Sequence, residues 1–362
     1  MYIYEHPTWP AFTWDLERIF PSLTEAVHLH GVLVGRMEAL GIEARQEANL
    51  LVTAHTVVSS SAIEGEVLDL TAVKASISRQ LASPFAIEHT VDGVVAAHLD
   101  ASQQYAAPLT LDRLNMWHRV LFPTGESGVR SIATGTLRDD SNGRMQVVSY
   151  SPGFVPIVLY EAPHATELRG EMDRFLSYLN DSDLTHPFIK AAIAHLWFVT
   201  LHPYEDGNGR IGRAIIDYIL ARGEENELRF YSPSTEINRA KRNYYAALES
   251  TQKGSLDITF WIIWFLDCLA RSLANAKDII APVLRRERFY RQAATLPLSK
   301  NQRVLLARYL DDFTGNLTSS KYATICKVSQ DTATRDLKDL CNKGLFAQVG
   351  AGRSTHYVLR EE

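Results

Sequence analysis

Hydrophobic residues recur at steps of three and four along most of this 362-residue chain, which is the spacing of one face of an α-helix. The pattern predicts helices at residues 22–40, 42–65, 112–121, 164–180, 187–201, 209–222, 239–252 and 258–284. The helix predicted at 187–201 carries apolar residues on more than one side, which is typical of a central, buried helix. The sequence therefore predicts a mainly α-helical protein.

One stretch, residues 136–160, departs from the helical pattern. Asp140-Ser141-Asn142-Gly143 is a turn signal, and Met145-Gln146-Val147-Val148 follows it with strand propensity. We therefore expect a β-hairpin that projects as a flap from the helical domain.

The pattern changes again near residue 295. Three short helices are predicted, followed by two short strands joined by Gly350-Ala351-Gly352-Arg353; the expected ranges are 301–313, 319–327, 330–343, 345–349 and 355–359. This order of elements is that of a winged helix-turn-helix. We expect a separate domain at residues 296–362.

Composition and charge narrow the classes of protein. The chain has 37 basic and 42 acidic residues, a net charge of −5, which is untypical of a protein held on nucleic acid by bulk charge. Its three cysteines, Cys268, Cys326 and Cys341, have no disulfide or metal-ligand spacing and are expected to be reduced thiols. The N-terminus lacks the features of a signal peptide, and the most apolar run, 258–270, is shorter than the ~20 residues that span a bilayer. We expect a cytoplasmic protein that does not enter a membrane.

The segment with the clearest chemistry is residues 202–213, His-Pro-Tyr-Glu-Asp-Gly-Asn-Gly-Arg-Ile-Gly-Arg, between two predicted helices. Gly207 and Gly209 allow positive φ angles, so that backbone N–H groups can approach an anion. The helix that follows adds its free amides and its dipole. Arg210 and Arg213 are three residues apart and project near the same first turn.

Asp206 and His202 complete this site. A carboxylate before the glycines can hold Mg²⁺ on phosphate oxygens, and an imidazole can take a hydroxyl proton near neutral pH. Taken singly, a histidine before proline is ordinarily a helix-end residue and Gly-Asn-Gly ordinarily a turn. All of them together, in this order, indicate a site where a hydroxyl attacks a nucleoside triphosphate.

This segment resembles the signature of the Fic family of nucleotidyltransferases, His-Pro-Phe-x-Asp/Glu-Gly-Asn-Gly-Arg-x-x-Arg. Eight of its nine specified positions match, and Tyr204 replaces the phenylalanine, which is a packing residue in the family. The resemblance implies a protein adenylyltransferase that moves AMP from ATP to a Tyr, Ser or Thr hydroxyl of a target protein and releases pyrophosphate. It implies His202 as general base, Asp206 as Mg²⁺ ligand, Asn208 on the α-phosphate, Gly207 and Gly209 as amide donors, and Arg210 and Arg213 on the β- and γ-phosphates, with Ile211 and Gly212 in the same nucleotide-binding segment.

A carboxylate near the end of the helix predicted at 42–65 continues its inward face. Leu50, Ala54, Val57, Ser61 and Glu64 are spaced by three and four, and a buried carboxylate is costly unless it is paired. The alternative is that Glu64 lies at a frayed helix end. Ser60-Ser61-Ala62-Ile63-Glu64-Gly65 resembles the inhibitory motif of the family, Ser/Thr-x-x-x-Glu-Gly/Asn. The resemblance implies that Ser60 and Glu64 hold the site inactive, with Glu64 pairing with Arg213.

Two further groups of residues are expected to contact the substrates. The resemblance implies that an extended segment of the target adds as a strand to the flap at Met145, Gln146, Val147 and Val148; the alternative is an ordinary surface hairpin. Tyr245 and Gln252, on a helix after the signature, suit an adenosine pocket. The alternative for the tyrosine is core packing, since aromatic pairs on helices are mostly core.

The resemblance also organises the chain. It implies an N-terminal helical domain with the inhibitory helix at 1–100, where the aromatic residues near the start are expected to pack, and a Fic-type helical bundle with its following helices at 101–295. The domain at 296–362 has ten basic and seven acidic residues, and its second helix-turn-helix helix carries Asp331, Asp336 and Asp339 beside its basic residues. We expect protein docking there before DNA binding, and a homodimer is compatible with the resemblance. The competing functions are removal of AMP at the same site, and a DNA-binding regulator whose Fic core senses a nucleotide.

Overall fold

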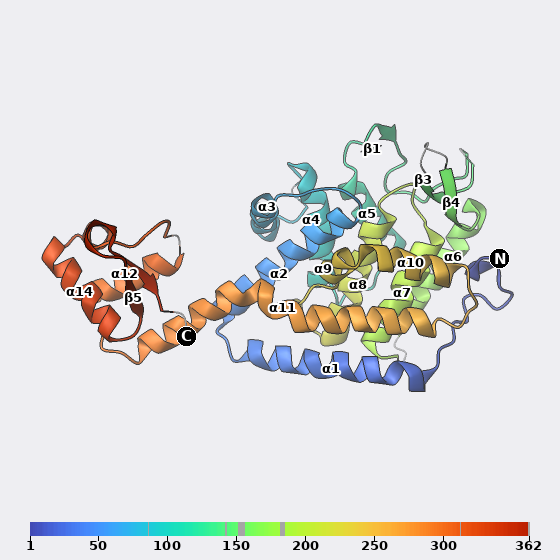
Figure 1. Cartoon of the computed structure of the whole chain (residues 1–362). Helices are drawn as coiled ribbons and strands as arrows, with labels where there is room; N and C mark the ends of the chain where they lie inside the picture. The colour runs from blue at the N-terminus through green and yellow to red at the C-terminus, as the bar shows by residue number, and fades with distance from the viewer. Residues whose placement is uncertain (86, 142, 151–155, 182–184, 312, 361–362) are drawn as a thin grey trace. The chain divides into compact units, whose positions relative to one another are not determined.

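The chain, in a computed structural model, is described at residues 1–85, 87–141, 143–150, 156–181, 185–311 and 313–360. It divides into two compact units, Met1–Ile280 and Ala281–Glu362, shown with their elements in Figure 1. The predicted mainly helical fold is confirmed. The three-domain division with boundaries near residues 100 and 295 stays a prediction.

The first unit is built almost entirely of helices. They are η1 (Ile3–Glu5), α1 (Leu16–Glu38), α2 (Ile42–Ile63), α3 (Leu70–Ala82), α4 (Thr90–Gln103), α5 (Leu111–Leu121), α6 (Ala165–Asn180), α7 (Pro187–Leu201), α8 (Asn208–Glu224), α9 (Pro233–Arg239), α10 (Lys241–Gln252) and α11 (Thr259–Ala294), which continues into the second unit. The sequence pattern missed α3, α4 and α9. It also began α1 after Pro21, whereas Asp15 accepts a hydrogen bond from the Arg18 N–H and caps the helix at Leu16.

Helix α8 occupies the centre of this unit. It packs against α7, α4, α5 and α2, and α7 is buried along almost its whole length, as its two-sided apolar pattern predicted. The N-terminal aromatic residues pack on this centre: the Trp9 and Phe12 rings lie edge-on to Trp197 of α7. The residues on either side of the α7–α8 connection are therefore held by a rigid core.

Two antiparallel strand pairs project from the same side of the helical unit (Figure 1). β1 (Glu126–Ser127) pairs with β2 (Arg130–Ser131), and β3 (Gln146–Tyr150) pairs with β4 (Pro156–Glu161), with a register shift between Val147 and Val148. A hairpin is present as expected. The turn signal at 140–143 precedes β3 instead of joining the strands; its Asn142 and the connection at 151–155 lie outside the described residues.

The second unit has the predicted order of three helices and a strand pair. Its elements are α12 (Lys300–Asp311), α13 (Ser319–Cys326), α14 (Gln330–Asn342), β5 (Phe346–Val349), η2 (Gly352–Ser354) and β6 (His356–Leu359). A backbone bridge between Leu317 and Tyr357 adds a short third pairing to the β5–β6 sheet. The side chains of Leu305, Leu337 and Phe346 lie in its buried core. In the part of the chain that the structure describes, no helix is long and apolar enough to cross a bilayer.

Candidate active site

His202 lies immediately after the last residue of α7, in a left-handed backbone conformation with φ 48° and ψ 57°. Its Nδ1 lies 3.2 Å from the Val199 carbonyl oxygen. Because a carbonyl oxygen only accepts, Nδ1 carries the proton and Nε2 keeps its lone pair. Burial lowers the pKa of His202 below its usual value, and the nearby Arg138 cation lowers it further. The ring is therefore a neutral imidazole whose unprotonated Nε2 can accept a proton.

Arg138, which the sequence pattern did not single out, holds the backbone of this histidine. Its backbone N–H donates to the Pro203 carbonyl at 2.9 Å and its Nε donates to the His202 carbonyl at 2.8 Å. The Arg138 side chain is 1% exposed, and its Nη1 also pairs with Asp140 at 2.6 Å. These contacts fix the unusual backbone conformation from which the imidazole projects.

The loop after His202 is closed by Asn208. The Asn208 amide oxygen accepts from the Tyr204 N–H at 2.9 Å, and its nitrogen donates to the Tyr204 carbonyl at 2.8 Å. Tyr204 is fully buried, with its hydroxyl 3.0 Å from Asn115 Oδ1, so the phenol found in place of phenylalanine is satisfied. Gly207 has φ +76°, and a Cβ there would lie 2.8 Å from the Phe122 ring, so glycine is required. The Asn208 contact with the α-phosphate stays a prediction; one amide N–H remains for it.

Asp206 projects its carboxylate toward the strand pair β1–β2. Its Oδ1 accepts from the Gly207 N–H at 2.5 Å and its Oδ2 from the Ser127 hydroxyl. His118 connects Gly135 to the backbone of Asp206. Its Nδ1 accepts from the Gly135 N–H at 2.9 Å and therefore carries no proton. Its Nε2 carries the proton and donates to the Asp206 carbonyl at 3.2 Å. His118 and Ser127 thus contact Asp206, the predicted Mg²⁺ ligand. No motif or spacing in the sequence indicated either contact.

The metal site itself would depend on a single protein carboxylate. Among the described residues no group of three or more His, Cys, Asp or Glu side chains could hold a metal ion. A lone carboxylate fits Mg²⁺, which commonly takes one or two protein ligands and completes its shell with phosphate oxygens and water. Asp206 as its ligand stays a prediction.

Arg213 is the most enclosed cation of the site, with no exposed side-chain surface. Its Nη2 lies 2.8 Å from Glu64 Oε1 and 2.8 Å from the Ser60 carbonyl, and its Nε donates to Ser60 Oγ at 2.9 Å. Desolvation lowers the pKa of Arg213, but the charge and hydrogen bond of Glu64, together with Tyr244 and Tyr245, raise it above its usual value. A Cβ placed on Gly209 would lie 2.1 Å from Glu64 Oε1, so this carboxylate sits directly over the first turn of α8. Ser60, Glu64, Gly209 and Arg213 are thus brought together as expected.

Arg210 is held by a carboxylate that the sequence analysis missed. Its Nη1 lies 2.8 and 2.9 Å from the two oxygens of Glu66, and its guanidinium lies 4.9 Å from the centre of the Phe122 ring. The available signal was an acidic residue two positions after Glu64. Both arginines of the signature are therefore ion-paired in this structure.

The other predicted nucleotide residues lie at different depths. Ile211 and Gly212 are buried in α8, where a Cβ on Gly212 would lie 3.1 Å from the His195 ring. Gln252 is 6% exposed and its amide nitrogen lies 3.3 Å from Thr200 Oγ1. Tyr245 is 39% exposed, and its hydroxyl donates to the Ile63 carbonyl at the end of α2. The adenosine-contact role of Tyr245 and Gln252 stays a prediction.

The flap residues alternate along the chain. Gln146 and Val148 are exposed, whereas Met145 and Val147 are half-buried. Gln146 donates to Glu161 Oε2 at 2.8 Å, which ties β3 to β4. Their contact with a target segment stays a prediction.

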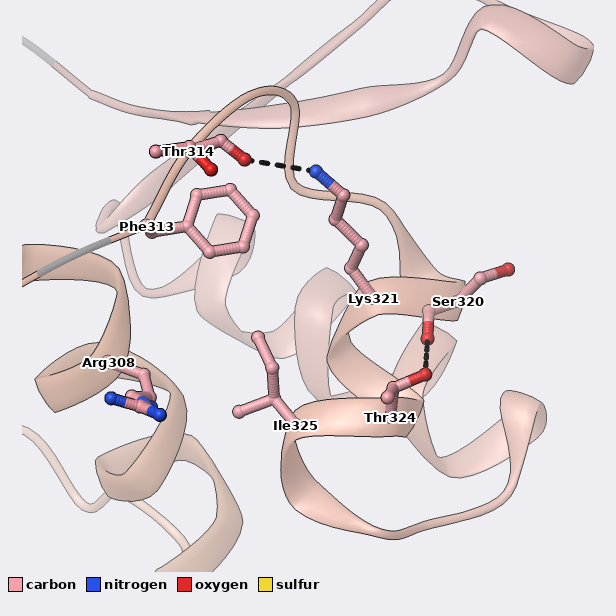
Figure 2. Close-up of a pocket in the computed structure, with 7 residues that line it drawn as sticks. All are labelled: Arg308, Phe313, Thr314, Ser320, Lys321, Thr324 and Ile325. Carbon is pink, nitrogen blue, oxygen red and sulfur yellow. Dashed lines mark hydrogen bonds between the residues drawn. The ribbon is translucent and has the colours of Figure 1, made fainter.

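A separate hollow of about 620 Å³ lies wholly within the second unit (Figure 2). Lys321 of α13 donates to the Thr314 carbonyl at 3.0 Å, and its ammonium lies 5.0 Å from the centre of the Phe313 ring. Arg308 of α12 is exposed at the same hollow. None of the predicted nucleotide or target residues belongs to it.

Comparison with known families covers most of the chain. Residues 108–220 match the model of the Fic/DOC family, and residues 2–82 match a domain of unknown function, DUF4172. Residues 306–360 match a model described as the C-terminal domain of DIP2311-like transcriptional regulators.

Curated relatives match part of the chain. The chain is 32% identical over 126 residues to a protein adenylyltransferase Fic of Culex quinquefasciatus, covering 34% of this chain and 22% of that protein. It is 31% identical over 179 residues to the protein of the same name from Drosophila grimshawi, covering 49% and 32%. The chain thus spans about a fifth to a third of the length of these relatives.

Solved structures show the same fold. A Fic family protein from Desulfovibrio desulfuricans G20 aligns with 98% of this chain and 98% of its own, with a TM-score of 0.59 and 20% identity. A Fic domain containing signaling protein from Bacteroides thetaiotaomicron VPI-5482 aligns with 71% of this chain and 97% of its own, with a TM-score of 0.51 and 18% identity. These two likenesses concern the fold, whereas the family model confirms the Fic resemblance of the signature: residues 108–220 of the chain are a Fic domain.

Proposed function

We propose that this protein is an adenylyltransferase that moves AMP from ATP to a Tyr, Ser or Thr hydroxyl of a target protein, and that Glu64 holds it inactive. The observation that carries the proposal is the neutral His202, with Nε2 unprotonated, at the head of the loop that leads to the first turn of α8. The names of the curated relatives support the same activity.

In the proposed reaction, the oxygen of the target hydroxyl attacks the α-phosphorus of ATP while His202 Nε2 takes the hydroxyl proton. The new bond joins that oxygen to phosphorus, the bond from the α-phosphorus to the bridging oxygen breaks, and pyrophosphate leaves. Arg210, Arg213 and the first amides of α8 stabilise the phosphate charge. Mg²⁺, held by Asp206, would neutralise part of that charge.

The inhibition follows from where the Glu64 carboxylate lies. The carboxylate lies over the first turn of α8 beside Gly209 and is hydrogen-bonded to Arg213 Nη2. It therefore excludes phosphate oxygens from this position sterically and also repels their negative charge. A γ-phosphate placed at Arg213 must displace it. The resting chain would therefore bind ATP weakly or in a pose in which the α-phosphorus does not face His202.

Removal of AMP at the same site is a second candidate. Among the described residues Glu64 Oε2 has no hydrogen-bond partner, and a free carboxylate oxygen could align a water for hydrolysis. In that case Glu64 would be required for the reaction, whereas in the transfer reaction it only opposes it.

A radiolabelled-ATP assay with Mg²⁺ on wild type, Glu64→Gly and His202→Ala tests the proposal. We expect strong labelling of Glu64→Gly, weak labelling of wild type and none of His202→Ala, because only the first has a free Arg213 and a base. Equal, low labelling of wild type and Glu64→Gly would contradict inhibition by Glu64. Loss of a pre-formed AMP label with wild type but not with Glu64→Gly would favour removal.

For the second unit we propose a winged helix-turn-helix that contacts duplex DNA. The acidic residues of α14 made DNA binding less expected, but two of them form hydrogen bonds within the unit. Asp336 accepts from the Tyr322 hydroxyl at 2.8 Å, and Asp339 accepts from Gln302 at 2.7 Å. Arg335 and Lys338 of α14 are exposed. The match to a domain of transcriptional regulators supports the same proposal.

A gel shift with mixed genomic fragments at low salt tests DNA contact. We expect retardation by the full chain that weakens with added salt and in the Arg335→Ala/Lys338→Ala variant, because phosphate contacts release counterions. The control is Arg169→Ala, which removes one cation on α6 of the first unit and should leave the retardation unchanged; the single variants Arg335→Ala and Lys338→Ala match it in charge. No retardation by wild type would favour docking of a protein instead.

A further inference from the structure

We propose that Glu66 competes with nucleotide phosphates for Arg210 and so sets nucleotide affinity together with Glu64. This inference rests on the proposed function. Both Glu66 oxygens lie within 2.9 Å of Arg210 Nη1, so the whole carboxylate engages this nitrogen. The pair joins residues 144 positions apart in the sequence, which links the end of α2 to the first turn of α8.

The end of α2 explains how two carboxylates reach the same turn. The Gly65 N–H donates to the Ala62 carbonyl and the Glu66 N–H to the Ser61 carbonyl, both at 3.0–3.1 Å, which closes the helix. Gly65 has φ +90°, a conformation that residues with a side chain rarely adopt. The chain therefore reverses between Glu64 and Glu66, and each carboxylate meets a different arginine.

Arg210 has little freedom to serve Glu66 and a phosphate at once. Its side chain is 6% exposed and one face of its guanidinium lies over the Phe122 ring. Its buried Nε has no partner in the part of the chain that the structure describes. Glu66 itself is 47% exposed, so it can swing into solvent at small cost, whereas Arg210 stays in place. A phosphate oxygen that binds Arg210 Nη1 would displace Glu66.

The two carboxylates are therefore not equivalent. Glu64 blocks Arg213 and fills the space over Gly209, so its loss opens the productive site. Glu66 does not fill the space over Gly209; it only pairs with Arg210 and neutralises its charge. Removing Glu66 should tighten nucleotide binding with or without Glu64, and should lower the KM for ATP more than it raises kcat.

Isothermal titration calorimetry with ATP and Mg²⁺ tests this in a His202→Ala background, where no turnover consumes the nucleotide. Because ion pairs with one half-exposed partner are weak, we expect Glu66→Gln to lower the Kd for ATP roughly threefold, and again roughly threefold when added to Glu64→Gly. Asp173→Asn is the matched control: it removes one carboxylate from an exposed ion pair with Arg169 on α6 and should leave the Kd unchanged.

An unchanged or higher Kd in Glu66→Gln overturns the inference; a higher value would mean that Glu66 orients Arg210 for phosphate. If Glu64→Gly transfers AMP while Glu66→Gln leaves the Kd as in the control, this inference alone fails. If Glu64→Gly neither binds ATP nor transfers AMP, the proposed function fails, and this inference with it.

Discussion

The Glu64→Gly substitution should change the stability of the protein in a way that ATP reverses. In the wild type, Glu64 Oε1 lies 2.8 Å from Nη2 of a fully buried Arg213. The substitution leaves this cation with its two Ser60 contacts, and with Nη1 unpartnered among the described residues. The variant would therefore hold the buried charge of Arg213 without its carboxylate partner, which should lower the free energy of unfolding.

The size of that cost follows from burial. Removing one partner of a fully buried ion pair costs about 3–5 kcal/mol. Because Glu64 is 30% exposed and Ser60 still binds the guanidinium, we expect the free energy of unfolding to fall by about 2 kcal/mol. Glu64→Gln, which keeps an oxygen for Arg213 but loses the charge, should lose less.

Binding of ATP should restore the free energy of unfolding that Glu64→Gly loses. A ligand at about 100 times its Kd stabilises the folded state by about 2.7 kcal/mol, so saturating ATP with Mg²⁺ should more than offset the loss in Glu64→Gly and stabilise wild type less. Denaturant unfolding followed by tryptophan fluorescence measures it on the first unit, which holds all six tryptophans: Trp9, Trp14, Trp117, Trp197, Trp261 and Trp264. A variant as stable as wild type, or equal stabilisation of both by ATP, would show that Glu64 does not compensate the buried charge of Arg213.

Two further predictions concern the core. Gly93→Ala should lower the free energy of unfolding by about 3 kcal/mol, because its Cβ would lie 1.8 Å from the Val120 carbonyl oxygen where α4 meets α5; an unchanged denaturation midpoint would contradict this packing. Burial lowers the pKa of His118 to about 4 against 6.5 in the unfolded chain, so its contribution is fully present above pH 6.5 and is lost as the pH falls toward 4. That amounts to about 2 kcal/mol between pH 7 and pH 5, and a His118→Gln variant with the same pH slope as wild type would be inconsistent with a neutral, buried ring.

Sequence periodicity predicted most of the helices, the deeply buried α7 among them, but missed α3 and α4, where polar side chains also face inward. Residues 91–99 of α4 are all buried, polar Asp92 and His98 included, so its apolar residues do not mark a single inward face; the helix also contains Gly93 and three valines. In α3, the inward positions alternate between apolar Val73 and Ile77 and polar Ser76 and Gln80. A pattern of apolar residues alone could not reveal either helix.

The same contrast holds at the site. The signature segment is local, so its glycines and arginines could be recognised by spacing, and the family motif placed Glu64 beside Arg213. Glu66, His118 and Ser127 reach the signature from other elements, across 144, 88 and 79 positions of sequence respectively. Only the packing of α2, α5 and the β1–β2 pair on the signature shows that these side chains meet it.

Intact-mass and peptide mass spectrometry of Glu64→Gly after incubation with ATP and Mg²⁺ measures whether His202 transfers AMP once Glu64 no longer holds Arg213. We expect an AMP adduct on a Tyr, Ser or Thr hydroxyl of the protein itself, and no adduct when His202→Ala is added. No adduct, or an adduct that persists without His202, would contradict the proposed transfer.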